Sequence, residues 1–405
     1  MDQSTVLVAL ESATPQEALA ALSRGPRSIE CPDLGSGRLV FPRYKEVRHL
    51  LRDPYFLCAP TAAGMLAAVG PRTRQVLGSV ASWVLYADPP LHSRLRGLLA
   101  KVFAPRRIVA LQAAIASHAD ELVAGFIARG GGDAVTELAQ PLPVSTISAL
   151  LSVPEADQSK VRAWSDDVVL ITEPKLTVAQ EHQAATGWSR LSEYFDDLMG
   201  QRRVRPGADI VSGLVHADNG DRLTDEEIIA NCIALLVGGH ETTSSLLSSL
   251  LLAAASHAEH RDAVVGSETH AAQFVEEVLR LYGPSKITAR VPREDTDVLG
   301  VPVAAGQRLI LLQASANRDP EIFDAPEEFR PERRPNPHLG FGYGSHACFG
   351  AMLARMQAVA LLRAFMHESH KLTIDTASVV WKPSQVLRTA ARLPVSVVPT
   401  PRGAR

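Results

Sequence analysis

The sequence predicts a mainly α-helical protein with a few small β-sheets, folded as one large domain over residues 1–405. Three observations lead to this prediction. Long stretches carry apolar residues at helical spacing, strand patterns are few and short, and no internal repeat or low-complexity linker divides the chain. The composition, with 46% hydrophobic and 21% charged residues, is that of a globular protein with ample material for a core.

Four segments show the helical periodicity most clearly. The first, from Arg106 to Gly130, ends on glycines, which are favoured just beyond a helix C-terminus. The second runs from Thr224 to His260, with Thr224 as its N-cap and acidic residues in its first turn. The third runs from Thr269 to Gly283, and the fourth from Cys348 to His370.

Strand patterns are expected at residues 37–42, at residues 296–313 as a hairpin followed by a strand, and at residues 393–399. Residues 317–338 are rich in proline and arginine and show little periodicity. A loop of that length in a compact protein is usually functional or packed against something.

Composition also excludes several classes of protein. The net charge of -3 gives no sign of nucleic-acid binding. The four cysteines, Cys31, Cys58, Cys232 and Cys348, form no CxxC pair, which favours a reducing, cytoplasmic location. The N-terminus lacks the basic start of a signal peptide, and no apolar stretch reaches membrane-spanning length. We therefore expect a soluble protein without a membrane anchor.

The stretch FGYGSHACFG, at residues 341–350, places one cysteine among glycines ahead of a helical run. Glycine lets the backbone lie flat against a ligand. At a helix N-terminus, free N–H groups and the helix dipole favour the thiolate of Cys348 over its thiol. Such a thiolate suits a heme iron as axial ligand. The loop alone is equally compatible with a buried structural thiol.

The stretch GGHETT, at residues 238–243, lies inside the second predicted helix. Two glycines in a helix interior cost about 1 kcal/mol each relative to alanine, so they need a reason. The Thr242 hydroxyl can bond the carbonyl of Gly238, which would bend the helix and leave room for a small ligand. The alternative is a helix–helix contact through small residues, with Glu241 at a solvated edge.

These motifs resemble those of the cytochrome P450 monooxygenases, and the resemblance covers about residues 88–394. The loop resembles the family signature F-x-x-G-x-H/R-x-C-x-G at Phe341, Gly344, His346, Cys348 and Gly350. The resemblance implies the cytochrome P450 fold as a triangular prism-like single catalytic unit. It also implies a heme b cofactor with Cys348 as proximal ligand, His346 on a propionate, Phe341 shielding the sulfur, and Gly342 against the heme.

Further motifs follow in family order. GGHETT resembles the oxygen-activation motif, which implies that Glu241 and Thr242 deliver protons to iron-bound dioxygen. The pair Glu277 and Arg280 resembles the E-x-x-R pair, with Arg333 as its third, structural partner. The remaining basic residues that the resemblance places on the heme propionates are His92, Arg96 and Arg290.

The family's substrate-contact regions map loosely onto this chain. They give Trp83, Leu85, Ala234, Val237, Gly238, Lys286, Ile287, Thr288, Val386 and Leu387. Most of these are apolar, as a small-molecule pocket requires. Two interpretations of Lys286 stay open: its ammonium anchors an acidic or carbonyl-bearing substrate, or its side chain extends to the surface.

The resemblance implies an enzyme that inserts one oxygen atom from O2 into a small organic substrate, by hydroxylation or epoxidation, in secondary or natural-product metabolism. Oxidative coupling, desaturation or nitration on the same scaffold is an alternative. Two further alternatives are a heme-thiolate sensor without turnover, and a helical binding protein in which Cys348 is structural.

The chain has no room for a fused reductase domain, so electrons are expected from a ferredoxin or flavodoxin with its reductase. A basic patch flanking the cysteine loop would receive that acidic partner; its residues are Lys101, Arg106, Arg107, Arg334 and Arg355. Each of them is equally explained as a solvated surface charge. We expect a monomer.

Overall fold

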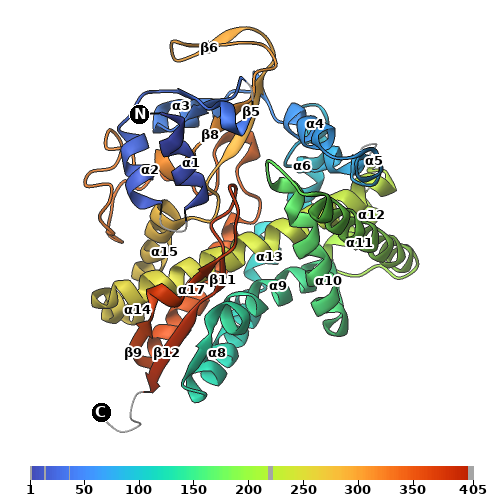
Figure 1. Cartoon of the computed structure of the whole chain (residues 1–405). Helices are drawn as coiled ribbons and strands as arrows, with labels where there is room; N and C mark the ends of the chain where they lie inside the picture. Colours follow the sequence, from blue (N-terminus) through green and yellow to red (C-terminus); the bar gives the residue numbers. More distant parts are fainter. Residues whose placement is uncertain (1, 13–14, 36, 218–221, 400–405) are drawn as a thin grey trace.

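The computed structural model describes residues 2–12, 15–35, 37–217 and 222–399. Helices dominate, as the sequence predicted (Figure 1). They are α1 (Gln3–Glu11), α2 (Gln16–Ser23), α3 (Tyr44–Arg52), α4 (Ala59–Ala68), α5 (Pro71–Val76), α6 (Leu91–Val102), α7 (Pro105–Val109), α8 (Gln112–Ala128), α9 (Pro141–Leu151), α10 (Glu155–Val168), α11 (Val178–Val204), α12 (Ile210–Val215), α13 (Asp225–Ser256), α14 (Arg261–Gly266), α15 (Glu268–Tyr282), α16 (Gln313–Ala316) and α17 (Ala351–Glu368).

The strands are short and form separate small sheets. They are β1 (Ile29–Glu30), β2 (Leu39–Phe41), β3 (Phe56–Leu57), β4 (Gly131–Asp133), β5 (Thr288–Pro292), β6 (Thr296–Val298), β7 (Val301–Val303), β8 (Leu309–Leu311), β9 (Ser369–Ile374), β10 (Val380–Trp381), β11 (Ala390–Arg392) and β12 (Pro394–Pro399). One sheet has the order β1-β2-β8-β5-β3, and another has the order β4-β12-β9. The pairs β6-β7 and β10-β11 complete the described sheets.

Helix α13 crosses the middle of the molecule, between the sheet with α1–α3 and the group of helices α8–α12 (Figure 1). It begins with a capping box, in which the Thr224 side chain accepts from the Glu227 N–H and the Glu227 carboxylate accepts from the Thr224 N–H. It packs on α9, α11, α15 and α17, so apolar residues on several faces are buried. The N-cap prediction is confirmed. The helix runs unbroken through residues 238–243, so GGHETT does not interrupt it.

The other predicted segments are confirmed with shifted ends. The first predicted helix is divided into α7 and α8, whereas α15 and α17 match the third and fourth. Helix α17 begins at Ala351, which leaves Cys348 in the loop before it. The predicted hairpin is β6–β7, followed by strand β8. No helix among the described residues is long and apolar enough to cross a membrane.

The loop at residues 317–338 is held by a buried charge network. The Arg280 guanidinium binds both carboxylate oxygens of Glu277, at 2.9 and 2.7 Å, and both side chains are 0% exposed. Arg333 donates to Glu277 at 3.2 Å, and Asn336 donates to it at 3.1 Å. Arg280 also donates to the Asn317 carbonyl. These bonds from α15 to both ends of the loop fix it without regular structure.

Candidate functional site

The cysteine loop folds tightly against helix α3. The Cys348 N–H donates to the Phe341 carbonyl at 2.9 Å, which closes the loop. Gly342 and Gly344 have φ of 70° and 76°, a region that favours glycine. A Cβ on Gly344 would lie 2.8 Å from the Leu51 carbonyl oxygen of α3. Glycine at 344 is therefore required both by the backbone and by the close approach of α3.

Cys348 differs from the other cysteines, since Cys31, Cys58 and Cys232 are buried and Cys348 is exposed. Its thiol can be reached from outside, yet protein atoms surround it closely. This desolvation raises its pKa, while N–H groups at Gly350 and Ala351 and the charges of nearby arginines act in the opposite direction. The donors expected from the sequence are in place. Burial nevertheless favours the thiol, so a bound cation is needed to make the thiolate dominant.

Four basic side chains converge beside this loop: His92, Arg96, Arg290 and His346. The two imidazole rings lie 4.0 Å apart, and Arg96 donates to the carbonyl of Ala347 at 2.9 Å. Burial, together with the charges of His92, Arg290 and Arg96, lowers the pKa of His346 to about 3. Burial and the charge of Arg96 also lower the pKa of His92. The cluster is thus mutually repulsive.

The residues fit the dianionic iron cofactor that the resemblance implies. His92 Nε2 is buried and has no hydrogen-bond partner among the described residues. A buried orphan nitrogen inside a repulsive basic cluster calls for an anionic acceptor, which two propionates would supply. Cys348, adjacent to this cluster through the Arg96–Ala347 bond, would be the ligand for the metal.

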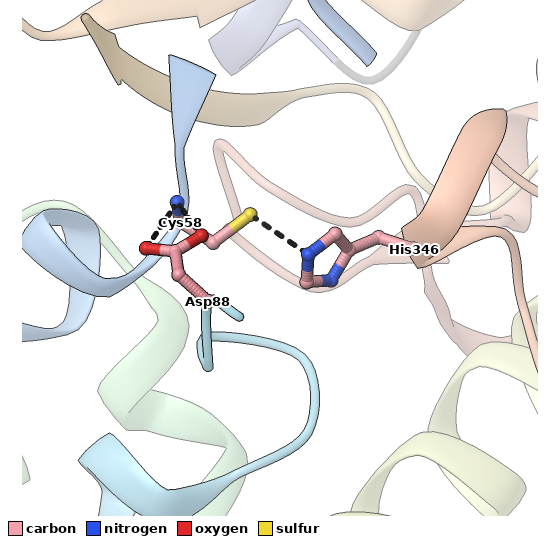
Figure 2. Close-up of side chains that lie close together, drawn as sticks. All are labelled: Cys58, Asp88 and His346. Carbon is pink, nitrogen blue, oxygen red and sulfur yellow. Dashed lines mark hydrogen bonds between the residues drawn. The ribbon is translucent and has the colours of Figure 1, made fainter. Parts of the chain in front are cut away.

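Cys58 and Asp88 also lie beside His346, and neither was predicted as a site residue. Figure 2 shows the Cys58 sulfur pointing at His346, with the Sγ–Nε2 distance 3.6 Å. Burial raises the pKa of the Cys58 thiol to about 11, so it keeps its proton and can donate to His346 Nε2. The Asp88 carboxylate accepts from the N–H groups of Cys58 and Ala59, which fixes the first turn of α4. With Nε2 accepting, the neutral His346 ring carries its proton on Nδ1.

The two glycines of α13 have different roles. A Cβ on Gly239 would lie 2.9 Å from Ile147 of α9, so this residue makes the close helix contact. A Cβ on Gly238 would meet nothing within 4 Å, and Gly238 is exposed although its helix is largely buried. The Thr242 hydroxyl donates to the Gly238 carbonyl at 2.5 Å, the bond expected from the sequence. The acid–alcohol pair, Glu241 and Thr242, therefore lies next to open space at Gly238.

Glu241 is buried, so the part of the alternative that placed it at a solvated edge is wrong, whereas the helix–helix contact through a small residue is present at Gly239. The Glu241 carboxylate accepts from Lys382 Nζ at 2.9 Å. The neighbouring His240 contacts Asp166 of α10, with Nε2 and Oδ1 3.0 Å apart. Burial alone would raise the pKa of Asp166, but the hydrogen bond and charge of His240 hold it below its usual range. Lys382 and Asp166 come from distant segments, so only the fold reveals them.

The predicted substrate contacts form two groups. Trp83, Ala234 and Val237 share one apolar cluster, in which Trp83 is buried and stacks on Trp188 at 5.9 Å. Leu85, near this group in the chain, is half exposed. Ile287 and Val386 share a different cluster. The segments that carry Thr288 and Leu387 meet there, through the bridge between Ser285 and Leu387. The structure does not place the two groups in one apolar cluster.

The interpretation of Lys286 as a surface side chain is wrong, and its role as a substrate anchor stays a prediction. The side chain is buried, so it does not extend to the surface. Its Nζ donates to the carbonyls of Leu10 in α1 and Ser384 in the C-terminal part of the chain, so two backbone groups hold the ammonium. Burial lowers its pKa to about 8. Lys286 is a link between the two ends of the chain.

This burial predicts a pH dependence of stability. Between pH 8 and its ordinary pKa of 10.5, Lys286 is neutral in the folded chain and charged in the unfolded chain. The unfolded state then binds more protons, so stability rises with pH across this window, by at most about 3 kcal/mol. We expect the free energy of unfolding of the wild type, minus that of Lys286→Met, to increase over this range in urea titrations. Parallel pH profiles would contradict the assignment.

Four of the five residues of the expected basic patch are exposed, and the fifth is engaged in an ion pair. Lys101, Arg106, Arg107 and Arg334 are exposed. Arg355 instead forms a two-bond pair with Glu276, at 2.7 and 2.8 Å, and its guanidinium lies 4.5 Å above the Phe341 ring. Arg355 therefore supports the cysteine loop, and its charge is already neutralised.

Comparison with known proteins agrees with this geometry. The family model for "Cytochrome P450" matches residues 169–266 and 270–386. Cytochrome P450 monooxygenase PikC of Streptomyces venezuelae is 37% identical over 319 residues, covering 77% of this chain and 75% of PikC. Nocardicin C N-oxygenase of Nocardia uniformis subsp. tsuyamanensis is 35% identical over 363 residues, covering 87% of this chain and 88% of the relative.

Solved structures give the same result. P450BioI in complex with an acyl carrier protein ligated to hexadec-9Z-enoic acid superposes with a TM-score of 0.88 at 28% identity, covering 97% of this chain and 100% of that one. The cytochrome P450 PksS of Bacillus subtilis 168 has a TM-score of 0.84 at 28% identity, covering 95% and 97%. This chain therefore belongs to the cytochrome P450 family of heme-iron monooxygenases.

Proposed function

We propose that this protein is a heme b monooxygenase that inserts one oxygen atom from O2 into a small organic substrate, by hydroxylation or epoxidation, in natural-product metabolism. It acts as a single catalytic domain over residues 1–405 and takes electrons from a separate ferredoxin or flavodoxin with its reductase. The relatives support the substrate class, since one is named a nocardicin C N-oxygenase and another a mycinamicin IV hydroxylase/epoxidase. Location in the cytoplasm belongs to the same proposal.

The observation that carries this proposal is the acid–alcohol pair beside an open position. Glu241 is buried, Thr242 bonds the Gly238 carbonyl, and a side chain at Gly238 would meet empty space. A protein that only binds heme and ligand has no need for a buried carboxylate next to such a hydroxyl. A sensor function is therefore disfavoured.

The residues of the chain have distinct tasks. Cys348 holds the metal, while His92, Arg96, Arg290 and His346 hold the propionates. When bound, the heme iron supplies O2 binding and activation. Glu241 holds a proton near Thr242, and the Thr242 Oγ1 passes it on, which is general acid chemistry. The Lys382 ammonium donates to the Glu241 carboxylate at 2.9 Å and so positions it.

Thr242→Ala tests the proton path. We expect the variant to consume reductant while making much less product, because general acid catalysis contributes roughly 100-fold or more to a step of this kind. A substrate is first found by screening a metabolite library for spectral shifts. Product per electron is then measured with a surrogate ferredoxin and its reductase. Thr243→Ala, the next residue on α13, is the matched control. Unchanged coupling in Thr242→Ala would show that the relay is wrong.

A further inference from the structure

A cavity of about 300 Å³ lies outside the site described so far. Its apolar wall includes Met65 from α4, Val80 from the 3₁₀ helix η2 (Gly78–Ser82) and Ile171 from the 3₁₀ helix η4 (Val169–Thr172). Two arginines, Arg38 and Arg308, stand in the same wall. Its volume is at the lower end of the range for small-molecule pockets, which is on the order of 300–1,000 Å³.

Neither arginine is neutralised by the protein. Among the described residues, no side chain accepts a hydrogen bond from Arg38 or Arg308 or forms an ion pair with it, and the Nε of Arg308 is buried without a partner. Burial lowers the pKa of both guanidinium groups, and the charge of Arg38 lowers that of Arg308 further. Two partly buried guanidinium groups that repel each other and have no acceptor among the described residues would be stabilised by an anion bound between them.

The other charged residues of the cavity do not supply that anion. The Glu173 carboxylate accepts from the Ser384 hydroxyl and, at 2.9 Å, from the Gln385 N–H. Lys175 donates to the Asp33 carbonyl at 3.4 Å. The carboxylate is thus engaged with the C-terminal part of the chain, and the arginines are left with unused donors.

The cavity adjoins the helix that carries the acid–alcohol pair. Its wall residues Val80 and Ile171 belong to the same apolar cluster as Val237, the residue before Gly238. Helix α13 packs directly on η2. The apolar part of a ligand in this cavity would therefore contact the same apolar cluster that contains Val237 of α13.

We propose that this cavity binds an organic anion, with Arg38 and Arg308 holding its carboxylate or phosphate head and the apolar wall holding its body. The inference deepens the proposed function and rests on it, because the anion is the substrate class of that enzyme. The cationic anchor for an acidic substrate is thus placed at these two arginines and not at Lys286. Guanidinium groups suit this task, since each can bind two oxygens of a planar or tetrahedral head.

Calorimetric titration of the heme-loaded protein tests the proposal without turnover. The probes are dodecanoate, its neutral methyl ester and dodecyl phosphate. We expect wild type to bind dodecanoate at least tenfold more tightly than the ester. Arg308→Gln and Arg38→Gln should each weaken dodecanoate binding by about 10- to 100-fold, the loss typical of a hydrogen bond to a charged group, and leave the ester unchanged. A preference for dodecyl phosphate over dodecanoate would identify the head as a phosphate.

Controls separate this proposal from general effects. Arg308→Lys keeps the charge and should retain part of the affinity, and Arg205→Gln removes an exposed guanidinium outside the cavity and should change nothing. If Arg308→Gln does not fold, two other measurements test the proposal. Arg38→Gln should weaken dodecanoate binding, and added salt should weaken dodecanoate binding to the wild type. Equal affinity for acid and ester overturns the inference. An intact thiolate spectrum in the same sample shows that the proposed enzyme class still stands.

Discussion

Replacing Cys348 with serine is expected to abolish monooxygenase activity, with a loss of more than about 100-fold, because even the residues that orient metal ligands contribute 10- to 100-fold. A serine hydroxyl does not supply the thiolate that the iron needs. The four basic residues remain in place to hold the propionates, so we expect the variant to retain heme. The measurement is the absorption of the ferrous carbonyl complex, whose Soret band shifts strongly when thiolate is the axial ligand.

The control for Cys348→Ser is Cys31→Ser, because Cys31 is buried in a cluster distant in sequence from the loop. This variant should keep the thiolate spectrum even if it loses some stability. A Cys348→Ser protein that still gave a thiolate-type carbonyl spectrum would disprove the ligand assignment. A wild-type protein without any Soret band would disprove heme binding altogether.

Glu277→Gln is expected to lower the free energy of unfolding by about 3–5 kcal/mol, because it removes the shared partner of two buried guanidinium groups. Arg280 and Glu277 are both 0% exposed, and the exposed fraction of Arg333 is 6%. Water cannot replace the lost acceptor there. Urea unfolding, followed by circular dichroism, measures the change. Residues 317–338 should also become sensitive to protease, since Arg280 bonds the Asn317 carbonyl and Glu277 bonds Asn336.

The matched control is Glu268→Gln on the same helix. Glu268 pairs with Arg363 at 3.7 Å, but both side chains are largely exposed, so its loss should cost less than about 1 kcal/mol.

The difference in free energy of unfolding between the wild type and Glu277→Gln, called here the wild-type advantage, should also depend on pH. Burial alone would raise the pKa of Glu277, but Arg280 holds it below 4.5, so the advantage is complete above that pH and declines in acid. Equal losses in the two variants would mean that burial of the network has no energetic role.

The elements of the fold follow from local patterns in the sequence. Thr224 and Glu227 form their capping box from neighbouring residues, and the apolar run of α13 must be buried whatever surrounds it. Helix ends were harder to predict: the segment from Arg106 divides into α7 and α8, with the break at residues 110–111. Neither residue there is a glycine or proline, so no local signal marks it.

Contacts in the site could be predicted only between residues that lie close together within one sequence motif. The bond from Thr242 to Gly238 spans one helical turn and could be anticipated from spacing. The contact of Lys382 with Glu241 spans 141 residues, and that of Cys58 with His346 spans 288, so only the folded chain brings them together. Lys286 was misinterpreted for the same reason, since its acceptors are 276 and 98 residues away.

Helix α4 links the cavity walled by Arg38 and Arg308 to the cysteine loop. It has 10 residues and is therefore about 15 Å long. Its first turn is fixed by Asp88, and its N-cap residue Cys58 touches His346, while Met65 near its other end forms part of the cavity wall. The cysteine loop and the cavity wall are therefore separated by the length of one short helix in the fold.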